Sequence, residues 1–277
     1  MDLIYRNRPV SQGTLKSYDK MYNSLKKLFP NSTETEQDGI TIASEPNILN
    51  TLHEHFPNPN TMKTYLYLII VIKKMNGRSP MLLMAETERL KKRVEVEKEE
   101  RKEEKKAELP SIETVAKYID GLKNPLSYVL NYLCFYNALR NQDLQMKVVA
   151  PGFEESPEEN YLVIMKTRCK IIINKYKTFP TYGRKEWVQT EKKFFKMAKQ
   201  LPLDVFTLTR DENEKVPDEL TSYYLRKHFM DDLTEADYCK IMVTGIVQSG
   251  LDINKRLSAI STTRGTSVEM LMSDYLM

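Results

Sequence analysis

The feature that most constrains the fold is a long charged run near the middle of the chain. From Glu86 to Glu108, Glu, Lys and Arg occupy nearly every position, and few apolar residues interrupt them. Such a stretch has no face to bury in a core, but opposite charges four residues apart stabilise a solvated helix. We therefore expect residues 86–108 to form a helical linker that closes an N-terminal domain, 1–108, and precedes a second domain, 109–277.

The first domain has the pattern of a small helical bundle. Apolar residues recur at helical spacing in three segments, 11–29, 46–56 and 62–75. The third segment is apolar on almost every side, which is typical of a helix buried at the centre of its domain.

The second domain combines helices with a short β-hairpin. The segments Tyr161–Lys166 and Cys169–Asn174 are rich in β-branched residues and are separated by a short turn, which predicts two paired strands. The periodicity predicts helices at 111–122, 125–138, 187–201, 218–233, 236–249 and 253–258. With only 9 glycines among 277 residues, the predicted fold class is mainly α with a small β-sheet.

Composition also limits where the protein works. The three cysteines, Cys134, Cys169 and Cys239, are odd in number and lie within apolar patterns, which is typical of a reducing compartment. The N-terminus lacks the apolar region of a signal peptide, and the longest apolar run, Tyr65–Ile72, is too short to span a membrane. We expect an intracellular protein, in the cytoplasm or nucleus of a host cell, that is not secreted.

Four residues in the second domain stand out as candidates for chemistry. Arg140 follows an apolar helix in YNALRNQDL, and Lys177 follows the second strand in NKYKTFPTYG. Arg226 lies in SYYLRKHF, and Tyr275 ends GTSVEMLMSDY. Each also has a plainer interpretation that involves no chemistry. Arg140 fits a surface capping pair with Asp143, and Lys177 fits a basic sheet edge. The Arg226 segment fits an aromatic core helix, and the Tyr275 segment fits an apolar core helix.

Taken in order, these motifs resemble the tyrosine recombinase (phage integrase) family, of the viral or mobile-element type. That family sets a lysine on a β-hairpin between two arginine motifs and ends on a nucleophilic tyrosine. This chain departs from the pattern at Tyr223, where the family has the histidine of His-x-x-Arg, and at Thr266, where it has histidine or tryptophan. The segments TLKSY and NTMKTYL resemble the core-binding domain that precedes the catalytic domain.

The resemblance implies a site-specific DNA recombinase that needs neither metal nor nucleotide cofactor. Tyr275 would attack a DNA phosphate and form a 3′-phosphotyrosyl bond. Arg140 and Arg226 would bind the phosphate oxygens, and Lys177 would protonate the leaving 5′-oxygen. Thr266 and Tyr223 would each contribute a hydrogen bond, but neither is a proton shuttle at neutral pH.

The implied partner is double-stranded DNA, gripped between the two domains. The chain stops two residues after Tyr275, so we expect a monomer that assembles as a homo-tetramer only on DNA. Two alternatives stay open: a DNA-binding protein on this fold that has lost catalysis, and a helical scaffold unrelated to DNA. The predicted phosphate contacts are basic residues of both domains: Lys16, Lys20, Lys63, Lys73, Lys74, Arg78, Lys170, Lys175, Arg184 and Lys185.

Overall fold

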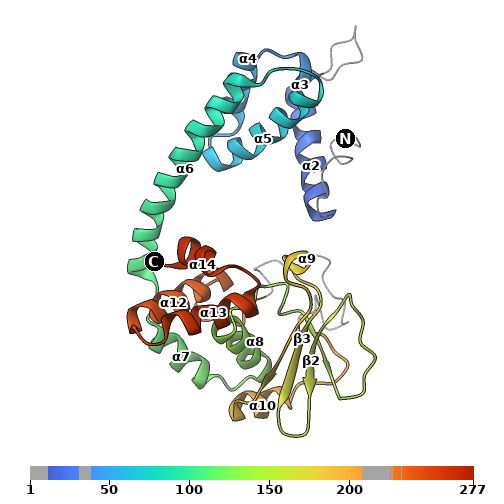
Figure 1. The fold of residues 1–277 in the computed structure, drawn as a ribbon, viewed down its shortest axis with the longest axis vertical. Coiled ribbons are helices and arrows are strands. Elements are labelled where there is room, and N and C mark those ends of the chain that lie inside the picture. Colours follow the sequence, from blue (N-terminus) through green and yellow to red (C-terminus); the bar gives the residue numbers. More distant parts are fainter. Residues whose placement is uncertain (1–11, 31–38, 208–224, 226, 232) are drawn as a thin grey trace. The chain divides into compact units, whose positions relative to one another are not determined.

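The chain is mainly α-helical with one small sheet, as its sequence predicts. A computed structural model describes residues 12–30, 39–207, 225, 227–231 and 233–277 (Figure 1). The chain divides into two compact units, residues 1–104 and 105–277, close to the boundary expected at residue 108. Within the described ranges, every helix is too short or too polar to cross a membrane.

The first unit is a helical bundle around a buried central helix. The central helix is α5 (Pro59–Met75), and Asn58 caps its start, because the Asn58 side chain accepts hydrogen bonds from the backbone N–H groups of Asn60 and Thr61. Leu66 and Ile69 of this helix have no exposed surface, which confirms the predicted burial. The helices of the bundle are α2 (Gln12–Leu28), α3 (Gly39–Ile42), α4 (Glu45–His55) and α5 (Pro59–Met75).

The charged run forms part of one continuous helix, α6 (Met81–Glu108). The helix starts inside the first unit, where a carboxylate oxygen of Glu45 accepts a hydrogen bond from the Leu83 N–H. Further along, Arg89 pairs with Glu86, and Arg93 pairs with Glu97. These pairs are the ones expected of a solvated helix that carries both charges.

The second unit packs its helices beside a four-stranded sheet (Figure 1). Its main core lies between the helices and one sheet face, which contributes Leu162 and Ile171. The opposite face carries Tyr161 and Ile172, covered in part by Phe153. The helices are α7 (Ile112–Gly121), α8 (Pro125–Tyr136), α9 (Phe179–Tyr182), α10 (Lys192–Ala198), α12 (Glu235–Ser249), α13 (Ile253–Arg264) and α14 (Val268–Tyr275).

The sheet confirms two predicted strands and adds two that were not predicted. Its strands follow the order of the chain: β1 (Met146–Val149), β2 (Asn160–Ile164), β3 (Cys169–Ile173) and β4 (Lys185–Gln189). The β1–β2 pair is parallel, whereas β2–β3 and β3–β4 are antiparallel.

The strand β4 corrects the helix predicted at 187–201. Trp187 pairs with Ile171 of β3, and its aromatic ring suits a pleated surface better than a helix. The helix α10 begins only at Lys192, where the carboxylate of Glu191 accepts hydrogen bonds from the first backbone N–H groups.

Two helix ends also differ from the predictions. The helix α8 stops at Tyr136, because Ala138 adopts a left-handed backbone with φ 50° and turns the chain before Arg140. The helix α13 runs on to Arg264, well beyond the predicted end at residue 258. The helix predicted at 218–233 lies largely outside the described residues.

Candidate active site

The candidate site is built around the C-terminal end of α13. A helix leaves its last carbonyl groups without partners inside the helix. Here three consecutive carbonyls accept hydrogen bonds from side chains that are distant in sequence. The pairs are Lys185 Nζ to the Thr263 oxygen at 3.1 Å, Arg140 Nη1 to the Arg264 oxygen at 2.6 Å, and Thr178 Oγ1 to the Gly265 oxygen at 2.7 Å.

Gly265 allows these groups to approach the helix so closely. Its backbone is left-handed, with a φ of +66°, and residues with a side chain rarely adopt this conformation. The left-handed residue ends α13. A Cβ atom at this position would overlap the Lys185 ammonium and lie 2.8 Å from both Thr178 Oγ1 and Tyr176 Cε2. The site therefore requires glycine at position 265.

Arg140 is held in a tight turn by Asp143. The Arg140 N–H donates to Asp143 Oδ2 at 3.2 Å, and the Asp143 N–H donates to the Arg140 oxygen at 2.9 Å. Asp143 is fully buried, so the interpretation of the two as a surface capping pair is wrong. Burial raises the pKa of Asp143 to about 6, although the hydrogen bond from the Arg140 backbone and the Arg140 charge oppose the rise.

Lys185 lies inside the site, although the sequence predicted only a DNA contact for it. It is the first residue of β4, and its ammonium lies 3.8 Å from the centre of the Tyr176 ring. Tyr176 is oriented by its own hydroxyl, which donates to the Gly183 oxygen and closes the β3–β4 connection. Burial lowers the pKa of Lys185 to about 8; Asp143 opposes this shift, while Arg140 and Arg264 add to it.

Tyr275 is contacted by an arginine that sequence reasoning missed. Arg264 Nη2 donates to the Tyr275 hydroxyl oxygen at 2.7 Å, and the guanidinium carbon lies 4.6 Å from the centre of the ring. Arg264 is 2% exposed, donates to the Ala138 oxygen at 2.8 Å, and pairs with Glu235 at 2.5 Å. The signal was available: Arg264 directly precedes the Gly265-Thr266 pair of the tyrosine motif.

The short helix α14 sets the position of Tyr275. Thr266 is buried, and its carbonyl accepts from Ser261 Oγ at 2.5 Å, which fixes the turn between α13 and α14. Ser267 then caps α14 by accepting from the Met270 N–H. Leu271 has no exposed surface, so α14 is anchored in the core with the partly buried Tyr275 at its end.

The remaining predicted catalytic residues are placed differently or not described. Lys177 is exposed on the β3–β4 connection, one residue after the buried Tyr176. Arg226 and Tyr223 lie outside the described residues. The groups that the fold gathers around residues 263–266 are Arg140, Lys185, Arg264, Thr266 and Tyr275.

The predicted DNA contacts of the first unit are mostly at its surface. Lys16, Lys20, Lys74 and Arg78 are exposed, and Lys63 is partly buried. Lys73 is different, because its ammonium is buried and donates to the Ala43 oxygen at 2.8 Å. Burial lowers the pKa of Lys73, while Glu45 opposes the shift. We therefore leave Lys73 out of the proposed DNA contacts.

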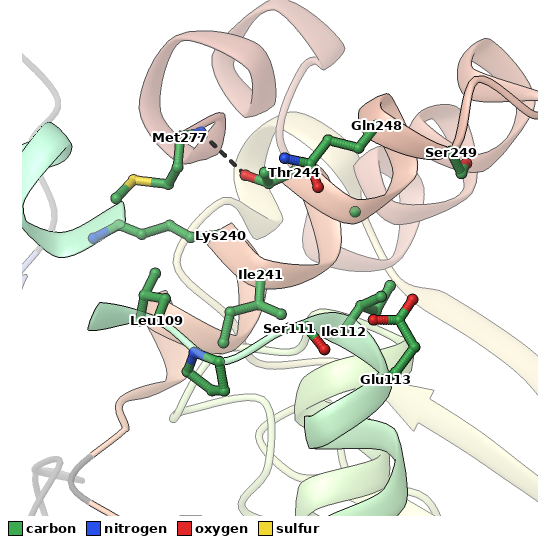
Figure 2. Close-up of a pocket in the computed structure, with 12 residues that line it drawn as sticks. Leu109, Ser111, Ile112, Glu113, Lys240, Ile241, Thr244, Gln248, Ser249 and Met277 are labelled. Atoms are coloured by element: carbon green, nitrogen blue, oxygen red, sulfur yellow. Dashed lines mark hydrogen bonds between the residues drawn. The ribbon is translucent and has the colours of Figure 1, made fainter. Parts of the chain in front are cut away.

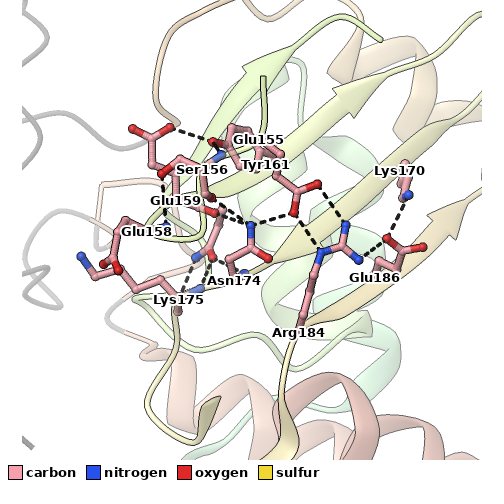
Figure 3. A network of polar contacts seen from close by, with 11 residues as sticks. Glu155, Ser156, Glu158, Glu159, Tyr161, Lys170, Asn174, Lys175, Arg184 and Glu186 are labelled. Atoms are coloured by element: carbon pink, nitrogen blue, oxygen red, sulfur yellow. Dashed lines mark hydrogen bonds and ion pairs between the residues drawn. The ribbon is translucent and has the colours of Figure 1, made fainter. Parts of the chain in front are cut away.

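In the second unit Lys175 is exposed, but two predicted contacts are engaged in ion pairs (Figure 3). Arg184 Nε donates to Glu155 at 2.9 Å, and its Nη1 pairs with Glu186. Lys170 pairs with the same Glu186 at 2.9 Å. Hydrogen bonds from Arg184 and from Lys170 lower the pKa of Glu155 and Glu186 respectively, so a phosphate would compete with carboxylates that stay charged.

A pocket of about 410 Å³ lies elsewhere in the same unit, between the start of α7 and α12 (Figure 2). Its lining includes Ile112, Ile241 and Lys240, and Met277 closes one side by donating its backbone N–H to Thr244. None of the five gathered residues lines this pocket. The candidate site is therefore the polar cluster at the end of α13.

Comparisons with known proteins leave the family open. No protein-family model matches the chain, and no curated protein matches it in sequence. Among solved structures, six chains match. One is the crystal structure of XerA recombinase, 10% identical, with a TM-score of 0.39 over 97% of this chain and 88% of that one. A likeness at this TM-score carries no argument for function, which must rest on the residues of the site.

Proposed function

We propose that the protein is a DNA strand transferase that cuts and rejoins double-stranded DNA with Tyr275 as its nucleophile. The observation that supports this is the clustering of a tyrosine hydroxyl with two guanidinium groups and a buried ammonium at one helix end. A phosphodiester is the substrate that this set of groups suits, because cations stabilise its charge and the phenol can displace an alkoxide.

The reaction transfers the phosphate without a net change in bond energy. The Tyr275 oxygen forms a bond to phosphorus, the bond to the 5′-oxygen breaks, and a 3′-phosphotyrosyl linkage remains. The phenol proton leaves to solvent, and a lysine ammonium protonates the departing 5′-oxygen. In rejoining, a 5′-hydroxyl attacks the phosphotyrosine and returns its proton to the lysine, while the Tyr275 oxygen leaves phosphorus and takes a proton from solvent.

Arg140 is the proposed clamp for the non-bridging phosphate oxygens. Its Nη1 donates to the Arg264 carbonyl, so within the described part of the chain the other donors of its planar guanidinium are free for the phosphate oxygens. The buried Thr266 hydroxyl is proposed to add one hydrogen bond. The roles of Arg226 and Tyr223 stay as the family resemblance predicts them.

The geometry favours Lys185 over Lys177 as the proton donor. Lys185 is buried among Arg140, Arg264 and Tyr176, whereas Lys177 is exposed. A pKa of about 8 also suits an acid that must give up its proton near neutral pH. We keep Lys177 as the alternative that the experiment below decides.

Replacing Lys185 with methionine should slow cleavage of ordinary DNA by about 10²–10⁴-fold, because the leaving alkoxide then lacks its acid. A substrate with sulfur at the 5′-bridging position should be cleaved at nearly the wild-type rate, since a thiolate leaves without protonation. Lys177→Met is the matched control and should be close to wild type on both substrates. The opposite pattern, with Lys177→Met rescued by sulfur, would assign the acid to Lys177.

The same assignment predicts how cleavage depends on pH. An acid must be protonated to act, and the protonated fraction of Lys185 falls as the pH rises through its pKa of about 8. Loss of the phenol proton to solvent becomes more favourable as the pH rises, which offsets the loss of the protonated acid. Single-turnover cleavage of ordinary DNA should therefore stop rising with pH above about 8, whereas cleavage of the 5′-sulfur substrate should continue to rise. The same levelling with both substrates would contradict the role of Lys185.

The proposal includes the partners implied by the resemblance. The exposed lysines and the arginine of the first unit are proposed to contact DNA phosphates, which makes that unit a DNA-binding domain. We propose a homo-tetramer assembled on DNA, an intracellular location and a source in a virus or mobile element.

A nicked duplex tests the function directly, because the short leaving strand diffuses away and traps the covalent intermediate. Wild-type protein should form an adduct stable to denaturation, and mass spectrometry should locate the nucleotide on the peptide that contains Tyr275. Protein that binds the duplex but never forms the adduct would favour the catalytically inactive DNA-binding protein. Protein that does not bind the duplex would contradict both.

A further inference from the structure

We propose that Arg264 is a catalytic residue that stabilises negative charge on the Tyr275 oxygen, both when this oxygen attacks and when it leaves. The inference rests on the proposed function and extends it to a residue that none of the motifs assigns. Arg264 touches the reacting atom itself, since its Nη2 lies 2.7 Å from the Tyr275 hydroxyl oxygen.

The surroundings of Arg264 make this hydrogen bond strong. The side chain is 2% exposed, and its guanidinium also faces the Tyr275 ring at 4.6 Å. A charged donor in a buried place interacts more strongly than it would in water, because little solvent screens it. An arginine also keeps its proton at any working pH.

Arg264 is held in place before any reaction begins. Its Nη1 donates to the Ala138 oxygen at 2.8 Å, and its Nη2 pairs with Glu235 at 2.5 Å. Fixed donors aimed at a developing charge cost no reorganisation during the reaction, which is why they accelerate it. The buried Nε–H has no hydrogen-bond partner among the described residues, so the guanidinium retains unused donor capacity.

The chemistry needs such a group. Tyr275 must lose a proton to attack phosphorus, and the same oxygen must carry charge when the 5′-hydroxyl displaces it. Within the described part of the chain, no carboxylate or imidazole hydrogen-bonds the Tyr275 hydroxyl; its partner there is Arg264. With the proton going to solvent, a fixed cation is the means by which this site can favour the phenolate in both directions.

A purely structural role is the competing interpretation. Arg264 joins the Ala138 turn, which precedes Arg140, to α14, which carries Tyr275. Its loss could therefore misplace either group without any electrostatic role. Changing the acidity of the phenol at position 275 separates the two interpretations. A more acidic phenol depends less on a cation to stabilise its negative charge, but it depends equally on correct positioning.

The experiment compares E235Q/R264Q with E235Q, so that Glu235 is not left as a buried unpaired charge. Each protein carries either tyrosine or 3,5-difluorotyrosine at position 275, and adduct formation on the nicked duplex is timed. Loss of Arg264 should slow the tyrosine protein by about 10²–10³-fold and the difluorotyrosine protein by at least tenfold less. The 5′-sulfur substrate should not restore the rate. Its thiolate leaves without an acid, but the Tyr275 oxygen still needs the charge of Arg264.

Arg256→Gln is the matched control on the same helix, because Arg256 donates to Ser249 and belongs to no part of the site. It should cleave at the wild-type rate. Thermal unfolding and duplex affinity establish that each variant is folded. If E235Q/R264Q does not fold, Arg264→Lys is compared with wild type on the same two nucleophiles.

The outcomes are distinct. Equal slowing with both nucleophiles would make Arg264 a structural brace and overturn the inference. A folded E235Q/R264Q protein that cleaves as fast as E235Q would also overturn it, while the proposed function would stand. Failure of wild-type protein to form any adduct would remove the proposed function and this inference together.

Discussion

Replacing Tyr275 with phenylalanine is expected to abolish the covalent protein–DNA adduct completely. The substitution removes the one oxygen that can bond to phosphorus, but it keeps the ring that faces the Arg264 guanidinium at 4.6 Å. The fold should survive, because the loss of one hydrogen bond from Arg264 costs about 1–3 kcal/mol. The measurement is adduct yield on the nicked duplex, with melting temperature and duplex affinity recorded for the same protein.

The control for this prediction is binding. Tyr275→Phe should bind the duplex with an affinity within a few-fold of wild type. This would show that the variant has lost the cleavage reaction and not DNA binding. An adduct that persists in this variant would mean that another of the 16 tyrosines, or a different nucleophile, attacks DNA. In that case the assignment of the site to the end of α13 would be wrong.

Replacing Arg140 with alanine should slow cleavage by about 10²–10³-fold, because one of the charged donors to the phosphate is lost. A methylphosphonate at the cleaved position should recover most of that loss, since a methyl group replaces the oxygen whose charge Arg140 neutralises. Arg140→Lys should recover little on ordinary DNA, because an ammonium lacks the planar fork of donors. Single-turnover rates on the two substrates provide the measurement.

Arg140 also bonds the Arg264 carbonyl at the end of α13, so a purely structural effect must be distinguished. If Arg140 only completes that helix end, Arg140→Ala should lower the melting temperature and slow both substrates equally. Rescue by methylphosphonate together with a nearly unchanged melting temperature would support the phosphate clamp.

The sequence predicted most helices and the strands β2 and β3, because their signals are local. Runs of β-branched residues between turns identify strands without knowledge of their neighbours. The strand β4 was missed because Trp187 and the residues after it have helix-like apolar spacing, and the pairing with Ile171 is a tertiary contact. The early end of α8 depends on the left-handed Ala138, which alanine does not signal.

The residue types that the fold gathers in the candidate site were predictable from the sequence, but not every position was, and their catalytic roles stay predictions. Arg140 and Tyr275 follow from motifs, whereas the choice between Lys177 and Lys185 depends on which lysine the β3–β4 connection turns inward. Tyr176 and Gly183 decide that by closing the connection with a hydrogen bond, which no spacing rule foretells. Arg264 was overlooked because the predicted helix stopped at residue 258, six residues too soon.

The end of α13 also explains how like charges can share one small volume in the free protein. Two guanidinium groups and an ammonium repel one another, but the negative pole of the helix draws Arg140 and Lys185 onto its last carbonyls. In the free protein those carbonyl oxygens accept the hydrogen bonds that a bound anion would accept. An arriving phosphate would therefore exchange one set of oxygen acceptors for another, with the cations already assembled to receive it.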